Sequence, residues 1–306
     1  MSNHKPRVSI GLPVYNGERF LKEALESILS QTFNDFELII SDNASTDATQ
    51  EICMLYGASD QRIRYYRNAQ NHGAAYNYRR VFELSTGEYF KWAAADDVCE
   101  PEYLACCVEA LDADSTIAVA HTKTRFIDEQ RRPLDITDPG WDLRSADAAE
   151  RLRYVMFSGH WVNIIFGLIR AKTLTRTRLV GSYPGGDYRV LGELALLGKF
   201  VELPHYFFLR RFHRDASSQH TDSLEWTVAF YSGTSHHLSM PTWQRTLDNF
   251  ITIMRSRLRP RLKLSLLVSL LRRMHWQQVQ FLRELKLAAM YFVRHFTSPS
   301  SSQPKS

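Results

Sequence analysis

Cysteine is scarce in this sequence, and its spacing excludes the common cysteine-based scaffolds. Only four cysteines occur in 306 residues: Cys53, Cys99, Cys106 and Cys107. They form no Cys-x-x-Cys pair, and no spacing of Cys and His is typical of zinc binding. A chain of this length buries about three quarters of its unfolded surface, so it needs no disulfide or structural metal to fold. We expect buried, reduced thiols.

Long apolar runs are also absent. The longest candidate, Leu264–Leu271, is far shorter than the ~20 residues of a membrane-spanning helix, and Arg272 follows it directly. The first residues, MSNHKPRVSIGLP, hold no apolar core of the length found in signal peptides. We therefore expect a cytoplasmic protein without a membrane span.

Acidic residues are nearly absent from the C-terminal fifth. Residues 250–306 hold 11 Lys and Arg residues and one acid, Glu284, a net charge of +10. Residues 1–249 carry 27 basic and 32 acidic residues, a net charge of −5. This asymmetry indicates a polyanion or an anionic membrane surface as a partner of the C-terminal segment.

The first 125 residues alternate between short apolar runs and helical periodicity. Runs that predict strands occupy residues 8–12, 36–40, 63–66, 89–94 and 116–122, and segments that predict helices occupy 18–30, 46–56, 74–84 and 102–110. Strands separated by single helices predict an α/β fold, with a mostly parallel central sheet flanked by helices on both faces.

The pattern is less regular after residue 125. A polar loop over residues 128–140 precedes predicted helices over 146–157 and 188–197 and predicted strands over 162–169, 200–203 and 207–213. Residues 214–245 are polar and predict no element. Residues 250–296 predict two basic amphipathic helices broken at Pro260, and the Ser/Pro-rich residues 297–306 predict disorder.

Polar residues gather where the predicted strands end, which is where sheets of this kind bind ligands. Asp96 and Asp97 follow an apolar strand, and such a carboxylate pair suits a hard divalent cation, although many such pairs only form turns or helix caps. Asp42 ends the second strand, within Ser41–Asp47, where the alternative is a tight turn with a helix cap.

As a set, these junctions resemble those of family 2 glycosyltransferases with the GT-A fold, over about residues 6–215. The matching motifs, in the family's order, are Pro13-Val14-Tyr15-Asn16-Gly17, Ser41-Asp42-Asn43-Ala44-Ser45-Thr46-Asp47, Arg67-Asn68, Asn71-His72-Gly73 with Asn77, and Ala95-Asp96-Asp97. The resemblance implies a catalytic domain over residues 1–215. In it, residues 1–125 bind a nucleotide sugar and residues 126–215 serve the acceptor and the base. An irregular connection (216–249), the basic helical extension (250–296) and the disordered tail (297–306) follow.

The resemblance also implies an activity: transfer of a sugar from a nucleotide-diphosphate donor to a hydroxyl acceptor, with inversion at the anomeric carbon. Polysaccharide, lipopolysaccharide or glycolipid synthesis in the cell envelope is the implied pathway. In the family, the residue matching Asp42 contacts the nucleobase. Donor binding is assigned to Pro13, Val14, Tyr15, Asn16, Asp42, Asn43, Arg67, Asn71, Asn77 and Asp96. The family motif that ends in Asp97 binds Mg²⁺ or Mn²⁺, and here Ala95 replaces its first acid.

Two further residues receive roles from the resemblance. Asp187 opens a predicted helix after Pro184-Gly185-Gly186, where the family places the general base that deprotonates the acceptor, although an ordinary helix cap is the alternative. Glu193 is the reserve candidate for the base. His213 ends the basic run Leu209–His213, where the family's His ligates the metal and an Arg meets phosphate; the alternative is a surface His.

The basic C-terminal segment admits three interpretations. It is a peripheral helix on an anionic membrane, a helix packed on protein, or a nucleic-acid surface. The apolar Leu264–Leu271 argues against nucleic acid, and a lipid-linked acceptor on the inner face of the membrane would suit the first.

Two other functions stay open. A nucleotidyltransferase would carry an early glycine-rich loop with a basic residue, and Pro13–Gly17 is not one. A non-catalytic, GT-A-like nucleotide-binding or membrane-scaffold protein is favoured by Ala95 and Gly186, which stand where the family often has acids.

Overall fold

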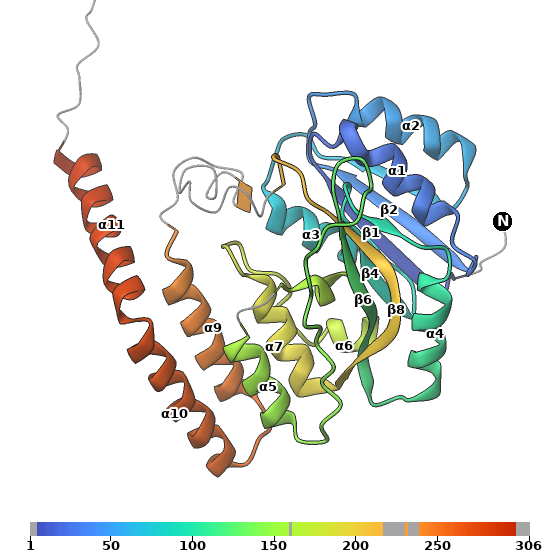
Figure 1. Ribbon diagram of the computed structural model, residues 1–306. Coiled ribbons are helices and arrows are strands. Elements are labelled where there is room, and N and C mark those ends of the chain that lie inside the picture. The colour runs from blue at the N-terminus through green and yellow to red at the C-terminus, as the bar shows by residue number, and fades with distance from the viewer. Residues whose placement is uncertain (1–4, 159–160, 217–229, 232–238, 298–306) are drawn as a thin grey trace, which may run out of the picture.

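An eight-stranded sheet forms the centre of the computed structural model, which describes residues 5–158, 161–216, 230–231 and 239–297 (Figure 1). The strands are β1 (Val8–Val14), β2 (Phe36–Asp42), β3 (Ile63–Arg67), β4 (Tyr89–Trp92), β5 (Val98–Cys99), β6 (Ile117–Ile127), β7 (Leu168–Arg170) and β8 (Lys199–Arg211). The helices are α1 (Glu18–Leu29), α2 (Thr49–Ser59), α3 (Ala74–Glu83), α4 (Tyr103–Ala113), α5 (Ala148–Phe157), the 3₁₀ turn η1 (Asn163–Phe166), α6 (Ala171–Leu174), α7 (Asp187–Leu197), α9 (Pro241–Arg255), α10 (Pro260–Trp276) and α11 (Gln278–Thr297).

The strand order is β3-β2-β1-β4-β7-β6-β8-β5. The pairings of β3 with β2, β2 with β1, β1 with β4 and β6 with β8 are parallel, and the pairings that involve β7 or β5 are antiparallel. The register aligns Val14 with Asp42 and Asp42 with Arg67. The predicted donor motifs therefore meet at one edge of the sheet.

Helices cover both faces of the sheet, as the alternating sequence pattern predicts. On one face, alternate residues of β1 and β2 pack against α1, α2 and α4; on the other, Phe90 and Trp92 pack against residues of α3, and β6 and β8 pack against α5 and α7 (Figure 1). Each fully buried large apolar side chain contributes about 1.5–3 kcal/mol. A third cluster joins α5 to α9 and α10 through Leu152, Ile253, Leu266 and Leu270.

Three parts of the structure differ from the sequence predictions. Residues 162–169 form η1 and the start of β7 instead of one strand, because the chain passes so close to β6 that a Cβ at Gly167 would lie 2.9 Å from Val119. The two strands predicted over 200–213 are one strand, β8, with an irregular register between Leu203 and Phe208. The short β5 has no counterpart in the predictions.

The C-terminal segment also differs. Residues 241–249 belong to α9, so the irregular connection expected over 216–249 ends earlier; most of its other residues lie outside the described residues. The break before Pro260 is confirmed, but a second break at Gln277 makes three helices instead of two. Of the expected disordered tail, only Thr297 is described, at the end of α11.

The single acid of this segment has a structural role. The carboxylate of Glu284 accepts hydrogen bonds from the backbone N–H groups of Thr242 (2.9 Å) and Trp243 (3.3 Å), which caps the start of α9. Within the described residues, no helix combines the length and the apolar character needed to cross a bilayer.

Candidate active site

Asp42 is the last residue of β2 and is completely buried. Its Oδ1 accepts the N–H of Ser45 (2.8 Å), and its Oδ2 accepts the hydroxyl of Tyr65 (2.8 Å) and the guanidinium of Arg67 (2.5 Å). These bonds compensate the buried charge. Within this pair, the Arg67 side chain is 33% exposed and that of Asp42 is fully buried, so Arg67 is the member that a ligand in solvent can contact.

Asparagines bind the neighbouring loops to one another. Asn43 donates to the side chain of Asn71 (2.7 Å) and accepts from Asn68 (2.9 Å) and the N–H of His72 (3.1 Å). Asn77 donates to the carbonyl of Ser41 (2.7 Å). Asn43 and Asn77 are buried, so the structure places them behind the surface of the loops, whereas Asn71 is half-buried.

The Pro13–Gly17 loop is locked onto the Ser41–Asp47 loop in a strained conformation. Asn16 (φ 51°) and Ala44 (φ 62°) both adopt the left-handed region, at a cost of roughly 1–2 kcal/mol for a residue such as alanine. The side chain of Asn16 accepts the N–H of Thr46 (2.8 Å). Val14 is buried and Pro13 half-buried, which leaves Tyr15, 48% exposed, as the large side chain that the loop presents.

Asp96, Asp97 and His213 come together from β4 and the end of β8. Asp97 is buried, and its Oδ1 accepts the N–H of Arg211 (2.9 Å). Burial and the charge of Asp96 raise the pKa of Asp97, and the positive charge of Arg210 partly offsets this. The half-buried Asp96 lies 2.9 Å from Nε2 of His213, whose buried Nδ1 has no hydrogen-bond partner.

These three side chains fit a divalent cation that arrives with its substrate. Across the described ranges, no group of three or more His, Cys, Asp or Glu residues is arranged to hold a metal alone. Mg²⁺, however, commonly takes one or two carboxylates and completes its coordination with phosphate oxygens and water. Asp97 keeps one carboxylate oxygen without a protein hydrogen bond, and His213 adds the buried, unpartnered Nδ1.

Asp187 begins α7 after a tight glycine turn. Gly181 and Gly186 are hydrogen-bonded (2.9 Å), and a Cβ on Gly186 would lie 2.2 Å from the carbonyl oxygen of Gly181. Asp187 is the first residue of α7, one position after the cap residue Gly186, and its carboxylate accepts the N–H of Tyr188 (2.9 Å). Burial raises the pKa of Asp187, and Arg245 and Arg210 lie close enough for their charges to oppose this rise.

Glu193, the reserve candidate for the base, is occupied by an ion pair. Its carboxylate accepts the backbone N–H of Arg178 (2.6 Å) and the guanidinium of the same residue (2.5 Å). The structure therefore gives Glu193 a structural role.

The two arginines of the Leu209–His213 run have different environments. Arg211 is buried, and its guanidinium bonds to the carbonyls of Asp96, Asp128 and Glu129 and to the carboxylate of Glu23. Arg210 lies over the ring of Trp161 (5.0 Å), and its charge lowers the pKa of both Asp97 and Asp187. Arg210 is therefore near both the candidate metal ligand and the candidate base.

Tyr78 of α3 is a site residue that the sequence gave no signal for. Its ring lies 6.2 Å from Trp92, and burial with the charges of Asp96, Asp97 and Asp187 raises its pKa. The half-buried phenol is thus near enough to all three carboxylates for their charges to act on it.

Helix α9 holds the turn before Asp187. Its Asp248 accepts Tyr183 Oη (2.5 Å) and Arg178 Nη1 (2.6 Å), and Arg189 lies 3.8 Å away. The predictions began this helix at residue 250 and missed its first turns, although Pro241 and the apolar spacing of Trp243, Leu247 and Phe250 are typical of a helix that begins with proline.

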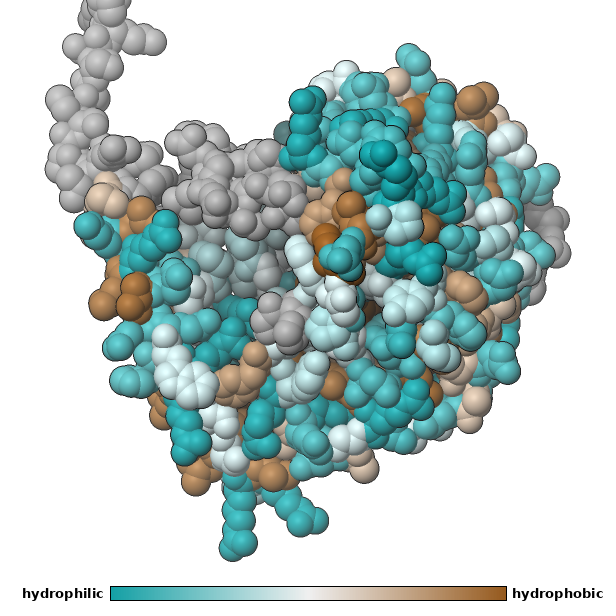
Figure 2. Space-filling model, in the orientation of Figure 1, coloured by the Kyte–Doolittle hydropathy of each residue, from teal (hydrophilic) through white to brown (hydrophobic). Residues whose placement is uncertain are grey.

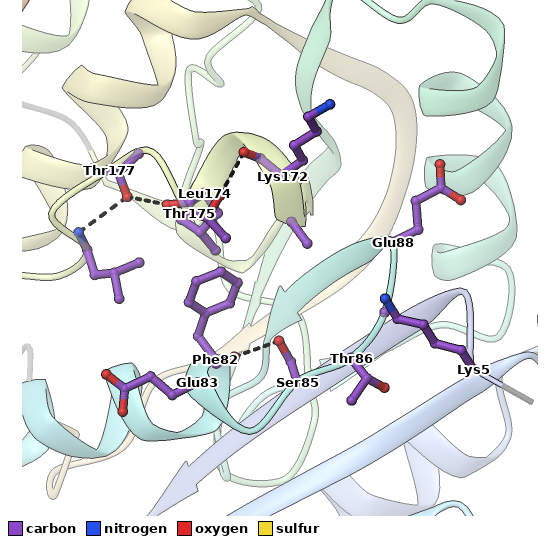
Figure 3. Close-up of a pocket in the computed structure, with 13 residues that line it drawn as sticks. Lys5, Phe82, Glu83, Ser85, Thr86, Glu88, Lys172, Leu174, Thr175 and Thr177 are labelled. Atoms are coloured by element: carbon purple, nitrogen blue, oxygen red, sulfur yellow. Dashed lines mark hydrogen bonds between the residues drawn. The ribbon is translucent and has the colours of Figure 1, made fainter. Parts of the chain in front are cut away.

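A surface pocket of about 600 Å³ lies elsewhere, near the amino end of β4. Figure 3 shows Phe82 of α3 with its ring directed toward Leu174 and Thr175, and Lys5, Glu88 and Lys172 also line the pocket. None of the predicted site residues lines it. Because ligands of such sheets bind at the carboxyl ends of the strands, this pocket is not the candidate site.

Comparison with known proteins agrees with the geometry. The sequence profile of glycosyl transferase family 2 matches residues 9–177. An uncharacterised glycosyltransferase of Rickettsia typhi is 31% identical over 139 residues (45% of this chain, 42% of that protein). Chondroitin synthase of Escherichia coli is 27% identical over 213 residues (70% of this chain, 30% of the synthase). The chain thus spans less than half the length of these curated relatives.

Solved structures share the fold at low sequence identity. Residues 1–349 of TarS from S. aureus, in complex with UDP-GlcNAc, superpose with a TM-score of 0.69 at 15% identity, over 91% of this chain and 79% of that chain. The mannosyltransferase PcManGT from Pyrobaculum calidifontis, in complex with GDP-Man and Mn²⁺, gives 0.58 at 18% identity, over 94% and 76%. The fold is that of GT-A glycosyltransferases, and with more than half of its length matched by the family profile, the chain belongs to glycosyl transferase family 2.

Proposed function

We propose that the chain transfers a sugar, with inversion, from a nucleotide-diphosphate donor to a hydroxyl acceptor in the synthesis of a cell-envelope polysaccharide, lipopolysaccharide or glycolipid. The observation that carries the proposal is the meeting of Asp96, Asp97 and His213 at the ends of β4 and β8, with Arg210 near enough for its charge to lower the pKa of both Asp97 and Asp187. An inverting transfer needs positive charge beside the leaving diphosphate and a base on the opposite side of the sugar. In this proposal Asp97 and Arg210 serve the leaving group, and Asp187 is the base.

The donor occupies the edge of the sheet formed by β1, β2 and β3. Tyr15, Asn16 and Arg67 are the exposed residues of the predicted set there, and Asn71 is half-buried. Asp42 holds Arg67 and receives the nucleobase when Arg67 moves. Asn16, Asn43 and Asn77 hold the loops of the site together through hydrogen bonds. The UDP-GlcNAc in TarS and the GDP-Man in PcManGT support this class of donor.

Asp97, with His213, holds the divalent cation, and Asp96 faces the ribose. A bound Mg²⁺ or Mn²⁺ supplies positive charge against the departing diphosphate. Arg210 adds a permanent positive charge on the same side, and Arg211 fixes the backbone of the carboxylate pair through the carbonyl of Asp96 and Oδ1 of Asp97.

Asp187 takes the proton from the acceptor hydroxyl at its carboxylate, on the side of the sugar opposite the diphosphate. Its raised pKa makes it a stronger base than an exposed aspartate. The family's second acid is not needed for this step. The turn has no room for a side chain at Gly186, where a Cβ would lie 2.2 Å from Gly181 O.

The other feature that favours the non-catalytic alternative is Ala95. It is half-buried and packs against the apolar cluster beneath α1 and α4, and Asp96 and Asp97 follow it with two carboxylates of the motif.

Thermal stability against a panel of nucleoside diphosphates and nucleotide sugars, with and without Mn²⁺, tests the proposed function. A donor at 100 times its Kd is expected to add about 2.7 kcal/mol to the free energy of unfolding. Stabilisation that needs the metal, followed by release of the nucleoside diphosphate from one sugar donor, supports the transferase. Diphosphate binding with no transfer and no donor hydrolysis would favour the non-catalytic protein instead.

A peripheral position on the cytoplasmic face of the membrane, serving a lipid-linked acceptor, is part of this proposal. Of the twenty exposed large apolar side chains in the described part of the chain, twelve lie in α9, α10 and α11. Figure 2 shows apolar and hydrophilic residues interspersed along these helices. The exposed bases among them are Arg255, Arg257, Arg259, Arg261, Arg272, Arg283 and Lys286. Such a mixture suits anionic lipid.

Vesicle flotation tests this position. We expect binding to vesicles that contain phosphatidylglycerol and none to phosphatidylcholine alone. Each base near the surface contributes about 1 kcal/mol, so the double variant Arg257→Gln/Arg261→Gln is expected to bind roughly thirtyfold more weakly. Lys172→Gln, an exposed base outside this segment, is the control and is expected to bind normally. Equal binding by all three proteins would refute the membrane surface.

A further inference from the structure

Two arginines of the C-terminal helices point toward the catalytic domain. Arg245 shares the inner face of α9 with Asp248 and Thr252, and Arg273 shares the inner face of α10 with Leu266 and Leu270. Both arginines are half-buried, whereas most other bases of these helices are exposed.

Arg245 lies beside the candidate base. Its guanidinium carbon is 3.6 Å from the ring centroid of Tyr188, the residue that follows Asp187, and its Nη2 donates to the carbonyl of Ser158 (3.3 Å). Among the described residues, the buried Nε of Arg245 has no hydrogen-bond partner.

Arg273 lies over the ring of Phe157 (5.9 Å), the residue before Ser158, and its Nε donates to the side chain of Gln277 (3.1 Å). The two arginines are close enough to repel each other, because burial and the charge of Arg245 lower the pKa of Arg273 to about 10.

Neither guanidinium has a carboxylate within 4 Å among the residues that the structure describes. Of the other described acids nearby, Asp248 and Glu193 pair with Arg178, and Glu284 caps the start of α9. Asp187 is near enough for its charge to act on Arg245 but forms no ion pair with it. Two half-buried, mutually repelling cations near a single carboxylate are costly unless a ligand neutralises them.

We propose that Arg245 and Arg273 bind a phosphate group of the acceptor, next to Asp187; the assignment to the acceptor rests on the proposed function. Guanidinium groups pair with phosphate through two parallel N–H···O bonds, which Arg245 Nε and its neighbouring Nη provide in the required geometry. Two positive charges match a phosphate dianion better than a single carboxylate. The position beside Asp187 then brings the acceptor's hydroxyl to the base.

Titration with potassium phosphate in EDTA tests the subsite without donor, metal or turnover. Calorimetry and thermal shift on the 306-residue protein measure the binding, and potassium chloride at equal ionic strength is the reference. The variant Arg245→Gln/Arg273→Gln is expected to bind phosphate at least tenfold more weakly than the wild type. The variant Arg245→Lys/Arg273→Lys keeps the charges but loses the paired geometry, so its affinity for phosphate is expected to lie between those of the wild type and the Gln variant. Circular dichroism and Tm show whether each variant is folded, and the Lys variant still tests the proposal if the Gln variant does not fold.

Matched controls separate this subsite from other anion sites. Arg257→Gln/Arg272→Gln removes two exposed arginines of the same segment and is expected to bind phosphate as the wild type does. The proposal is overturned if the wild type binds no phosphate, if both the Gln and the Lys pairs bind it normally, or if only Arg210→Gln loses it. It is also overturned if the Arg245→Gln/Arg273→Gln variant loses only binding to phosphatidylglycerol vesicles, because the two arginines then bind a lipid headgroup. Phosphate binding in a protein that transfers no sugar would refute the proposed function and leave the subsite intact.

Discussion

Replacing Asp187 by Asn is expected to lower kcat for sugar transfer by about 10²–10⁴-fold, the usual contribution of a general base, while the affinity for the donor stays unchanged. Asn has nearly the same shape and still accepts the N–H of Tyr188, so the turn before α7 is kept. It cannot take a proton from the acceptor. Steady-state kinetics and donor titration on the same preparation measure both quantities.

The pH profile gives a second readout of Asp187. Burial raises its pKa above the ordinary value for aspartate of about 3.9. Because the base acts only when deprotonated, kcat/KM of the wild type is expected to fall as the pH drops through this raised pKa. The residual activity of Asp187→Asn is expected to lack that acidic limb. Glu109→Gln, an exposed carboxylate on α4, serves as the control and is expected to behave as the wild type. Wild-type kcat in Asp187→Asn would show that another group takes the proton.

Replacing Asp97 by Asn is expected to abolish the metal-dependent part of donor binding, with a loss of affinity of tenfold or more. The variant keeps an oxygen for the N–H of Arg211 but loses the charge that attracts a divalent cation. Without donor and metal, the variant is expected to be as stable as the wild type or more stable. Ionised Asp97 is buried beside Asp96 and costs free energy in the folded state at neutral pH, as its raised pKa indicates.

Thermal unfolding in four conditions, with and without nucleotide and with and without Mn²⁺, measures both effects of Asp97→Asn. The wild type is expected to show its largest Tm with both ligands, and the variant no difference between metal and EDTA. Glu109→Gln again controls for the loss of a carboxylate. If Asp97→Asn keeps the full metal-dependent shift in Tm, Asp97 does not hold the cation.

The order of strands and helices in the first 125 residues could be predicted because its signals are local. Runs such as Phe36–Asp42 are rich in apolar residues and are buried on both faces, and the turn residues between elements follow directly along the chain. The predictions failed where distant segments decide the conformation. Residues 162–169 are apolar enough for a strand, but the close approach of β6 at Gly167 ends η1 there.

The candidate site also has parts that the sequence predicted and parts that only the tertiary structure decided. The motifs at the strand ends predicted that Asp42 and Asp97 lie at one edge of the sheet, because parallel strands bring their carboxyl ends together, whereas Asp187 was assigned from the family resemblance. The sequence did not distinguish Arg210 from Arg211, because adjacent residues in a strand face opposite sides and only the packing shows which side is the site. It also did not show that Glu193 is held by Arg178.

By itself, the sequence determined the α/β architecture, the edge of the sheet that carries the polar motifs and the basic character of the C-terminal segment. Each of these depends on periodicity, turn chemistry or charge over a few neighbouring residues. The tertiary structure alone decided that α9 joins the site, with Asp248 on Tyr183 and Arg245 on Tyr188. These contacts bridge more than fifty residues of chain, and they form only because α9 and α10 bury Ile253, Leu266 and Leu270 against α5. Burial of that apolar surface stabilises the arrangement and fixes which arginines face the candidate base.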